Sequence, residues 1–79
     1  MIYYPHMATV TEEQKQKRKK LGDKLRIARE NLGLTQVQVA LEAKIDDNFY
    51  ARVERGEEAI LFERLQRVLK VLKIKSLEV

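Results

Sequence analysis

Two of the three glycines in this chain mark places where the helical spacing of the apolar residues is interrupted. Between residues 21 and 32, apolar side chains recur at steps of four, three and four residues, the spacing of one stripe along a helix. The members of this stripe are Leu21, Leu25, Ala28 and Leu32. Gly33 follows the stripe directly and Gly56 follows a later segment, and glycine is well suited to end a helix. The pattern therefore predicts several helices separated by turns.

Three short motifs predict where helices begin. Thr11-Glu12-Glu13-Gln14 and Thr35-Gln36-Val37-Gln38 both have the form of a capping box, in which the first and fourth side chains each bond to the other's backbone N–H. Asp46 is a good N-cap for a further helix, because its carboxylate can accept a hydrogen bond from the first helical turn. Lys44 and Ile45 form the turn before it.

The apolar residues of each later helix indicate which face is buried. In the helices that begin near residues 35 and 46, the inward positions are Val39, Ala40, Ala43, Tyr50 and Val53. A further amphipathic helix is marked by Phe62, Leu65, Val68, Leu69 and Leu72. Only residues 74–79 alternate as a strand would. We therefore predict an all-α domain of four or five short helices.

The composition excludes several classes of function. The 79 residues contain no cysteine, which excludes disulfides and thiolate zinc sites, and the only histidine, His6, lies in a segment that we expect to be disordered. No apolar run approaches the roughly 20 residues of a membrane span, and the first residues are too polar for a secretory signal. The glycines are too scattered for a phosphate-binding loop. We expect a cytoplasmic protein that has no cofactor and no catalytic activity.

The first 20 residues are predicted to form an arm that is separate from the domain of residues 21–79. Residues 1–10 show no periodicity, and Met7 is an alternative start. Five of the six residues from Lys15 to Lys20 are basic and repel one another, so we expect the first turns of a helix there to be frayed. The basic run is either a solvated helix face or an arm that contacts phosphates.

The charge of the chain is distributed unevenly. The net charge of +4 favours an anionic partner. The segment from residue 42 to residue 58 nevertheless contains six acidic and three basic side chains. The excess of positive charge therefore lies before and after this segment.

A set of residues between Leu21 and Leu77 occurs in the order and spacing of one known family. They are Leu21-Gly22, Leu25-Arg26, Arg29, Gly33-Leu34-Thr35-Gln36, Val39-Ala40, Ala43, Ile45, Arg52-Val53-Glu54-Arg55-Gly56, Leu65 and Leu72. In these residues the chain resembles the phage-repressor/Cro type of helix-turn-helix, also called the xenobiotic-response-element family. The resemblance implies a compact repressor-like domain in which the helix that starts after Asp46 reads DNA. It also implies that Arg29 and Glu54 form a structural ion pair between helices.

The resemblance implies a set of DNA-contacting residues as well. In the family, the glutamine that begins the second helix of the domain, here Gln36, contacts a phosphate with help from the helix N-terminus. The remaining positions, on the reading helix and in the turns before the two helices, are Asp47, Asn48, Phe49, Arg52, Thr35 and Lys44. Asn48 can pair with adenine and Arg52 with guanine, while Asp47 can accept from cytosine. Phe49 can contact a thymine methyl, and each of these side chains could instead be ordinary helix surface.

Glu57 and Glu58 depart from the family pattern, because members often have Lys or Arg just after the glycine that corresponds to Gly56. Two carboxylates at this place repel phosphate and remove affinity that comes from counterion release. Lys44 also stands where the family usually has glycine, at a cost of roughly 1 kcal/mol for a left-handed residue.

Apolar residues occupy further positions where the family is usually polar. They are Ile27, Val37, Leu41, Phe49, Ile60 and Leu61. Several exposed apolar side chains indicate a contact surface. Self-association through the C-terminal part of the chain would use Ile60, Leu61, Phe62, Ile74 and Leu77, with Leu72 and Val79 beside them. The same residues could simply close the core.

Two functions follow from these observations. The first is a sequence-specific regulator that binds double-stranded DNA as a homodimer on a pseudo-palindromic operator. The second is a protein-binding module on the same fold, such as an antitoxin-like partner or an anti-repressor, in which the acidic segment has weakened or abolished DNA binding. Gln36, Asn48 and Arg52 favour the first function, whereas Asp47, Glu57 and Glu58 favour the second.

Overall fold

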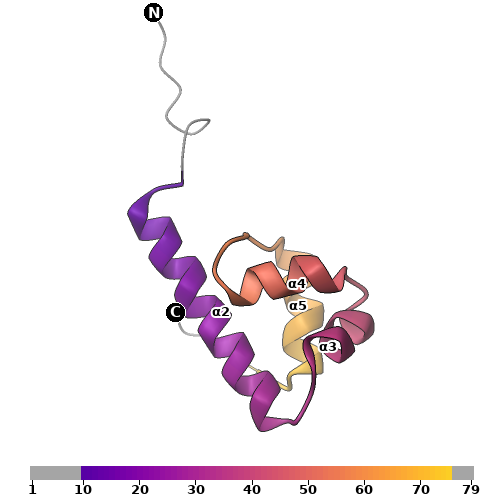
Figure 1. Cartoon of the computed structure of the whole chain (residues 1–79). Coiled ribbons are helices and arrows are strands. Elements are labelled where there is room, and N and C mark those ends of the chain that lie inside the picture. The colour runs from indigo at the N-terminus through magenta and orange to yellow at the C-terminus, as the bar shows by residue number, and fades with distance from the viewer. Residues whose placement is uncertain (1–9, 76–79) are drawn as a thin grey trace, which may run out of the picture.

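A computed structural model of the chain describes residues 10–75, and this part consists of four α-helices without a strand. The helices are α2 (Glu12–Asn31), α3 (Gln36–Ala43), α4 (Asp47–Glu54) and α5 (Phe62–Val71). The long helix α2 runs along one side of the three shorter helices (Figure 1). The all-α prediction is confirmed. Of the tail that alternates as a strand would, Ile74 is not in a strand, and residues 76–79 lie outside the described residues.

The predicted helix starts are confirmed by their hydrogen bonds. Thr11 and Gln14 close the first capping box, with the Gln14 N–H donating to Thr11 Oγ1 at 3.1 Å and the Thr11 N–H donating to Gln14 Oε1 at 3.0 Å. Thr35 and Gln38 close the second box in the same way. The carboxylate of Asp46 accepts from the Phe49 N–H at 2.9 Å. Helix α2 continues without a break past residue 20, so the described part of the basic arm and the first helix of the domain are one element.

The core lies where α3 crosses α4 and where α5 covers α3. Its buried apolar residues are Leu25, Val39, Ala40, Ala43, Tyr50, Val53, Val68 and Leu72. The inward faces predicted for α3 and α4 are thus confirmed. No helix within residues 10–75 combines the length and the apolar character needed to cross a membrane.

Two apolar residues at the ends of the predicted helical stripes are exposed. Leu32 is 40% exposed, because it follows the last turn of α2 and lines an open surface depression with Leu34 and Val71. Phe62 is 68% exposed, because it is the first residue of α5 and the buried stripe of that helix begins one turn later. Helical spacing identifies a face but not where the covering helices end, so a residue at the end of an apolar stripe can lie outside the core.

Gly22 and Gly56 allow α2 to approach the end of α4 closely. A Cβ atom on Gly22 would lie 2.6 Å from the carbonyl oxygen of Val53 and closer still to that of Glu54. Gly56 has a φ of +78°, and a Cβ atom there would lie 2.9 Å from the Cα of Lys19. The backbone of α2 therefore lies directly against the C-terminal end of α4 and the residues that follow it.

Candidate nucleic-acid interface

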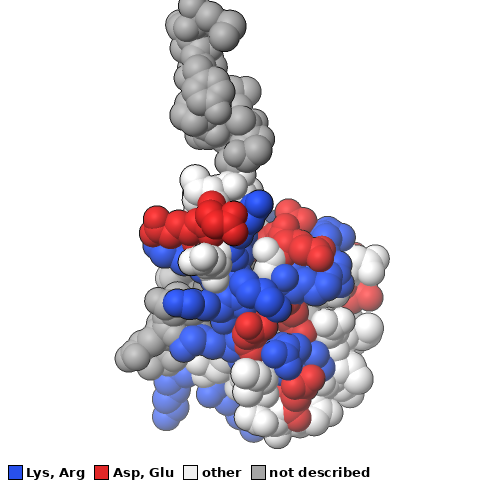
Figure 2. All heavy atoms as spheres, turned by 60° about the vertical axis from the view of Figure 1, so that its left-hand side comes forward, with Lys and Arg blue, Asp and Glu red and all other residues white. Residues whose placement is uncertain are grey.

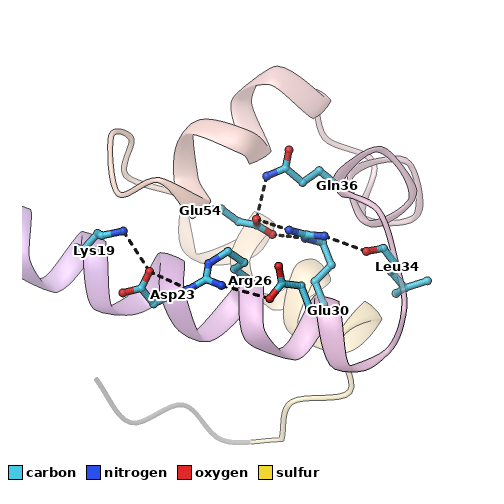
Figure 3. A network of polar contacts seen from close by, with 8 residues as sticks. Lys19, Asp23, Arg26, Glu30, Leu34, Gln36 and Glu54 are labelled. Atoms are coloured by element: carbon cyan, nitrogen blue, oxygen red, sulfur yellow. Dashed lines mark hydrogen bonds and ion pairs between the residues drawn. The ribbon is translucent and has the colours of Figure 1, made fainter.

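A buried ion pair joins α2 to α4. Arg29 donates from Nε to Glu54 Oε2 at 2.7 Å and from Nη2 to Glu54 Oε1 at 3.0 Å. The side chains of Arg29 and Glu54 are only 13% and 2% exposed. Arg29 also donates to the Leu34 carbonyl at 3.0 Å, and Gln36 donates from Nε2 to Glu54 Oε1 at 2.9 Å (Figure 3). The network therefore fixes the start of α3 relative to both α2 and α4.

The two charges of this pair stabilise each other. Burial by itself would raise the pKa of Glu54, but the hydrogen bonds from Arg29 and Gln36, together with the nearby hydroxyl of Tyr50, outweigh it and hold the pKa below its ordinary value. The hydrogen bond to Glu54 likewise raises the pKa of Arg29. Both groups are therefore charged at neutral pH.

Tyr50 lies fully buried beside this pair. Burial first, and then the nearby Glu54 carboxylate, raise the pKa of the Tyr50 phenol far above its ordinary value. Its hydroxyl oxygen has no hydrogen-bond partner within residues 10–75 that meets ordinary distance and angle limits. The phenol is neutral at any physiological pH.

The predicted DNA-contacting residues lie on α4 and at the ends of α3. Asp47 and Asn48 are exposed in the first turn of α4, and Arg52 lies one turn later. Phe49 is half-buried and packs against the core, so only part of its ring is accessible. The hydroxyl of Thr35 is used in its capping box. Lys44 is exposed and has a left-handed backbone with φ +59°.

The carboxylates that depart from the family pattern are both paired with arginines. Glu58 Oε2 accepts from Arg52 Nε at 3.0 Å. Glu57 accepts from Arg55 Nε and Nη2 at 3.0 and 3.1 Å. The hydrogen bond from Arg55 lowers the pKa of Glu57, and the same bond raises the pKa of Arg55. Each negative charge in this loop therefore has a positive charge beside it.

The N-terminal half of α2 carries a mixed charge pattern. Lys15, Lys17 and Lys19 each form an ion pair with a carboxylate one turn away on α2. A row of such pairs continues along the helix through Asp23, Arg26 and Glu30 (Figure 3). On this face of the molecule, basic side chains predominate and acidic side chains are interspersed among them (Figure 2). An open depression of about 730 Å³ lies between this half of α2 and residues 55–57.

The apolar residues that depart from the family pattern are divided between surface and core. Those with exposed side chains are Ile27, Val37, Leu41 and Leu61, together with Phe62. Leu41 is the most exposed of them, at 76%. Phe49, Ile60 and Ile74 are half-buried and pack against the core. Leu77 lies outside the described residues.

Two arginines that the sequence analysis did not single out lie beside the predicted reading helix. Arg67 donates from Nε to the Ala43 carbonyl, at the end of α3, at 2.8 Å. The guanidinium carbon of Arg64 lies 5.7 Å from the centre of the Phe49 ring. Their spacing of three residues places them on one face of α5, but no pattern in the sequence indicates that this face meets α4.

Comparisons with known proteins agree with this arrangement of helices. A family model described as helix-turn-helix matches residues 25–79. No curated protein and no solved structure matches the chain. The matched range includes α3, the left-handed turn at Lys44 and α4.

Proposed function

Because the chain belongs to the phage-repressor/Cro type of the helix-turn-helix family, we propose that it is a sequence-specific regulator that binds double-stranded DNA in the cytoplasm. The observation that carries this proposal is the exposed first turn of α4, which follows directly on the turn after α3. A helix placed in this way can enter the major groove with its N-terminal residues toward the bases.

The accessible polar groups of α4 supply the direct readout. Asn48 presents an amide that can pair with adenine N6 and N7. Arg52 donates its Nε to Glu58, which leaves its two Nη groups available for guanine O6 and N7. Asp47 can accept from cytosine N4, and the accessible edge of Phe49 can contact a thymine methyl.

Gln36 has a double role in this proposal. One of its amide hydrogens is used by Glu54, which holds the N-terminus of α3 in place. Its second amide hydrogen and the backbone N–H groups at the start of α3 then contact a phosphate. Thr35 and Lys44, at the two ends of α3, contribute to the same phosphate-facing edge.

We propose that two copies of the chain bind together on a pseudo-palindromic operator. Leu61 and Phe62 are exposed next to each other at the start of α5, which makes them the best candidates for a dimer contact. Ile60 and Ile74 pack on the core and would contribute only their accessible edges. Half-sites in such a dimer would be spaced by about one helical turn of DNA, roughly 34 Å.

The test is selection of bound duplexes from a random pool at low salt, with the wild-type chain and the Asn48→Ala variant in parallel. We expect the wild type to enrich an inverted repeat and Asn48→Ala to lose preference at one position of each half-site. A pool that stays random with the wild type would contradict sequence-specific binding. Enrichment of a single half-site would contradict the dimer but not the reading helix.

A protein-binding function is the second candidate, and Val37 and Leu41 favour it. They lie one turn apart on α3 and both are exposed, although neither is needed for the core. If the random pool is not enriched, a Val37→Ser/Leu41→Ser variant tests this surface. The variant should remain folded but lose a partner that the wild type retains in a complex of defined stoichiometry.

A further inference from the structure

Four cationic side chains from three elements meet at an open cleft of about 420 Å³ between α4 and α5. Lys44 comes from the turn after α3, Arg52 comes from α4, and Arg64 and Arg67 come from α5. Helix α4 packs mainly on α2 and α3, and α5 packs mainly on α3. The cleft therefore remains open between two helices that share a neighbour but contact each other little.

The positive charge in this cleft is poorly balanced. Among residues 10–75, Asp46 is the only acidic residue that lines it, and its carboxylate already accepts the hydrogen bond that caps α4. Arg52 forms an ion pair with Glu58, which balances part of its charge. Lys44, Arg64 and Arg67 have no carboxylate within ion-pair distance in the described part of the chain. Like charges gathered in this way repel one another until an anion joins them.

Contacts with the protein hold the arginines of α5 but leave donors available. Arg67 uses Nε to bond the Ala43 carbonyl, and its two Nη groups have no protein partner within residues 10–75. Arg64 lies over the Phe49 ring, within the range of a cation–π contact. A guanidinium group presents paired N–H donors that match the oxygens of a phosphate.

From this geometry we propose that the cleft binds a backbone phosphate of the same duplex that α4 reads. Phe49 and Arg52 line the cleft and also belong to the predicted reading surface, so a duplex on that surface brings its backbone to the cleft. The proposal rests on the DNA-binding function proposed above. It supplies cationic contacts beyond the α3 N-terminus, whereas Arg55 and Glu57 line a separate depression against α2.

The salt dependence of binding tests this assignment. Arg64 is exposed, so Arg64→Gln should fold normally, and Lys70→Gln is a matched control that removes one charge from the same helix outside this cleft. On a random-sequence duplex we expect Arg64→Gln to reduce the slope of log K against log salt by about 1 and affinity by roughly five- to tenfold near 0.1 M salt. Lys70→Gln should leave the slope unchanged.

The possible outcomes separate the two proposals. If the wild type binds no duplex even at low salt, both the DNA-binding function and the cleft assignment are overturned. If the wild type binds but Arg64→Gln and Lys70→Gln behave alike, only the cleft assignment fails. Arg67→Gln, with Arg67→Lys as the charge-preserving comparison and circular dichroism as the folding check, should repeat the effect of Arg64→Gln.

Inorganic phosphate distinguishes a backbone site from a site for a free anion. At constant ionic strength we expect phosphate to compete with the duplex no more than chloride does. Phosphate binding that Arg64→Gln abolishes, while the same variant leaves the affinity for the duplex unchanged, would assign the cleft to free phosphate and overturn the backbone assignment.

Discussion

Two of the arginine–glutamate pairs in this chain have similar chemistry but lie in very different surroundings. Arg29 and Glu54 join two helices, with side chains 13% and 2% exposed and an Nε–Oε2 distance of 2.7 Å. Arg52 and Glu58 join α4 to the following loop, with both side chains 42% exposed and an Nε–Oε2 distance of 3.0 Å. The first pair is surrounded by protein, and the second is open to solvent and to any partner.

The difference shows how burial changes the consequence of one interaction. Removing one partner of a buried pair leaves an uncompensated charge, which typically costs about 3–5 kcal/mol. An exposed pair typically contributes only about 0.2–1 kcal/mol, because water and salt replace the lost partner. The buried pair therefore stabilises the fold, while the exposed pair sets the charge and the available donors of the surface that we propose contacts DNA.

Arg29→Ala should have the largest effect on the free energy of unfolding, because it leaves the buried Glu54 carboxylate without its cationic partner. We expect a loss of about 3–5 kcal/mol in the free energy of unfolding, measured by urea denaturation. Arg52→Ala is the matched control and should cost less than about 1 kcal/mol. Equal losses of unfolding free energy in the two variants would show that burial does not make the Arg29–Glu54 pair more stabilising than the Arg52–Glu58 pair.

Gly22→Ala should have the second-largest effect on the free energy of unfolding. The added methyl group would push apart α2 and α4, the two helices that carry the buried pair. This methyl group would contact the carbonyl oxygens of Val53 and Glu54, which are backbone atoms and cannot rotate away. Overpacking of this kind costs about 1–3 kcal/mol. Gly33→Ala is the control for glycine replacement, since open space surrounds that position and only its φ of +70° opposes a side chain. A Gly22→Ala variant as stable as Gly33→Ala would contradict the close approach of α2 to α4.

Lowering the pH should weaken the buried ion pair, because it protonates the Glu54 carboxylate. The folded-state pKa of Glu54 lies below its ordinary value. Its contribution to stability is therefore complete above the unfolded-state pKa of about 4.3 and is lost as the pH falls through the folded-state pKa. We expect the free energy of unfolding to fall below about pH 4.3 more steeply in the wild type than in Glu54→Gln. If the free energy of unfolding falls equally steeply with pH in the wild type and in Glu54→Gln, protonation of Glu54 is not the cause of the loss of stability.

Replacing both loop carboxylates should have the smallest effect on folding and a clear effect on binding. We expect Glu57→Lys/Glu58→Lys to change the free energy of unfolding by less than about 1 kcal/mol. Affinity for any duplex at low salt should rise by roughly tenfold or more, measured by fluorescence anisotropy. Glu30→Lys/Glu42→Lys makes the same charge change elsewhere on the exposed surface. Equal gains in affinity in the two double variants would mean that the loop does not face the DNA.

The parts of the fold that depend on neighbouring residues were predictable from the sequence. Both capping boxes and the Asp46 cap follow from contacts that span a few residues, whereas the left-handed backbone at Lys44 was implied by the family resemblance. Val39, Ala40 and Val53 were assigned to the core by helical spacing alone. The same spacing includes Leu32 and Phe62, yet both are exposed, because a local pattern contains no information about where the neighbouring helices end.

The sequence by itself therefore determined the class of fold and the starts of three helices, since these follow from local hydrogen bonding and periodicity. Through the family resemblance it also supplied the residues that we propose read DNA. Only the tertiary structure decided which charges meet. It pairs Glu58 with Arg52, brings Gln36 to Glu54, and gathers Lys44, Arg64 and Arg67 around one cleft. The physical reason is distance along the chain: electrostatic contacts of this kind depend on how whole helices pack, and spacing rules describe only residues a few positions apart.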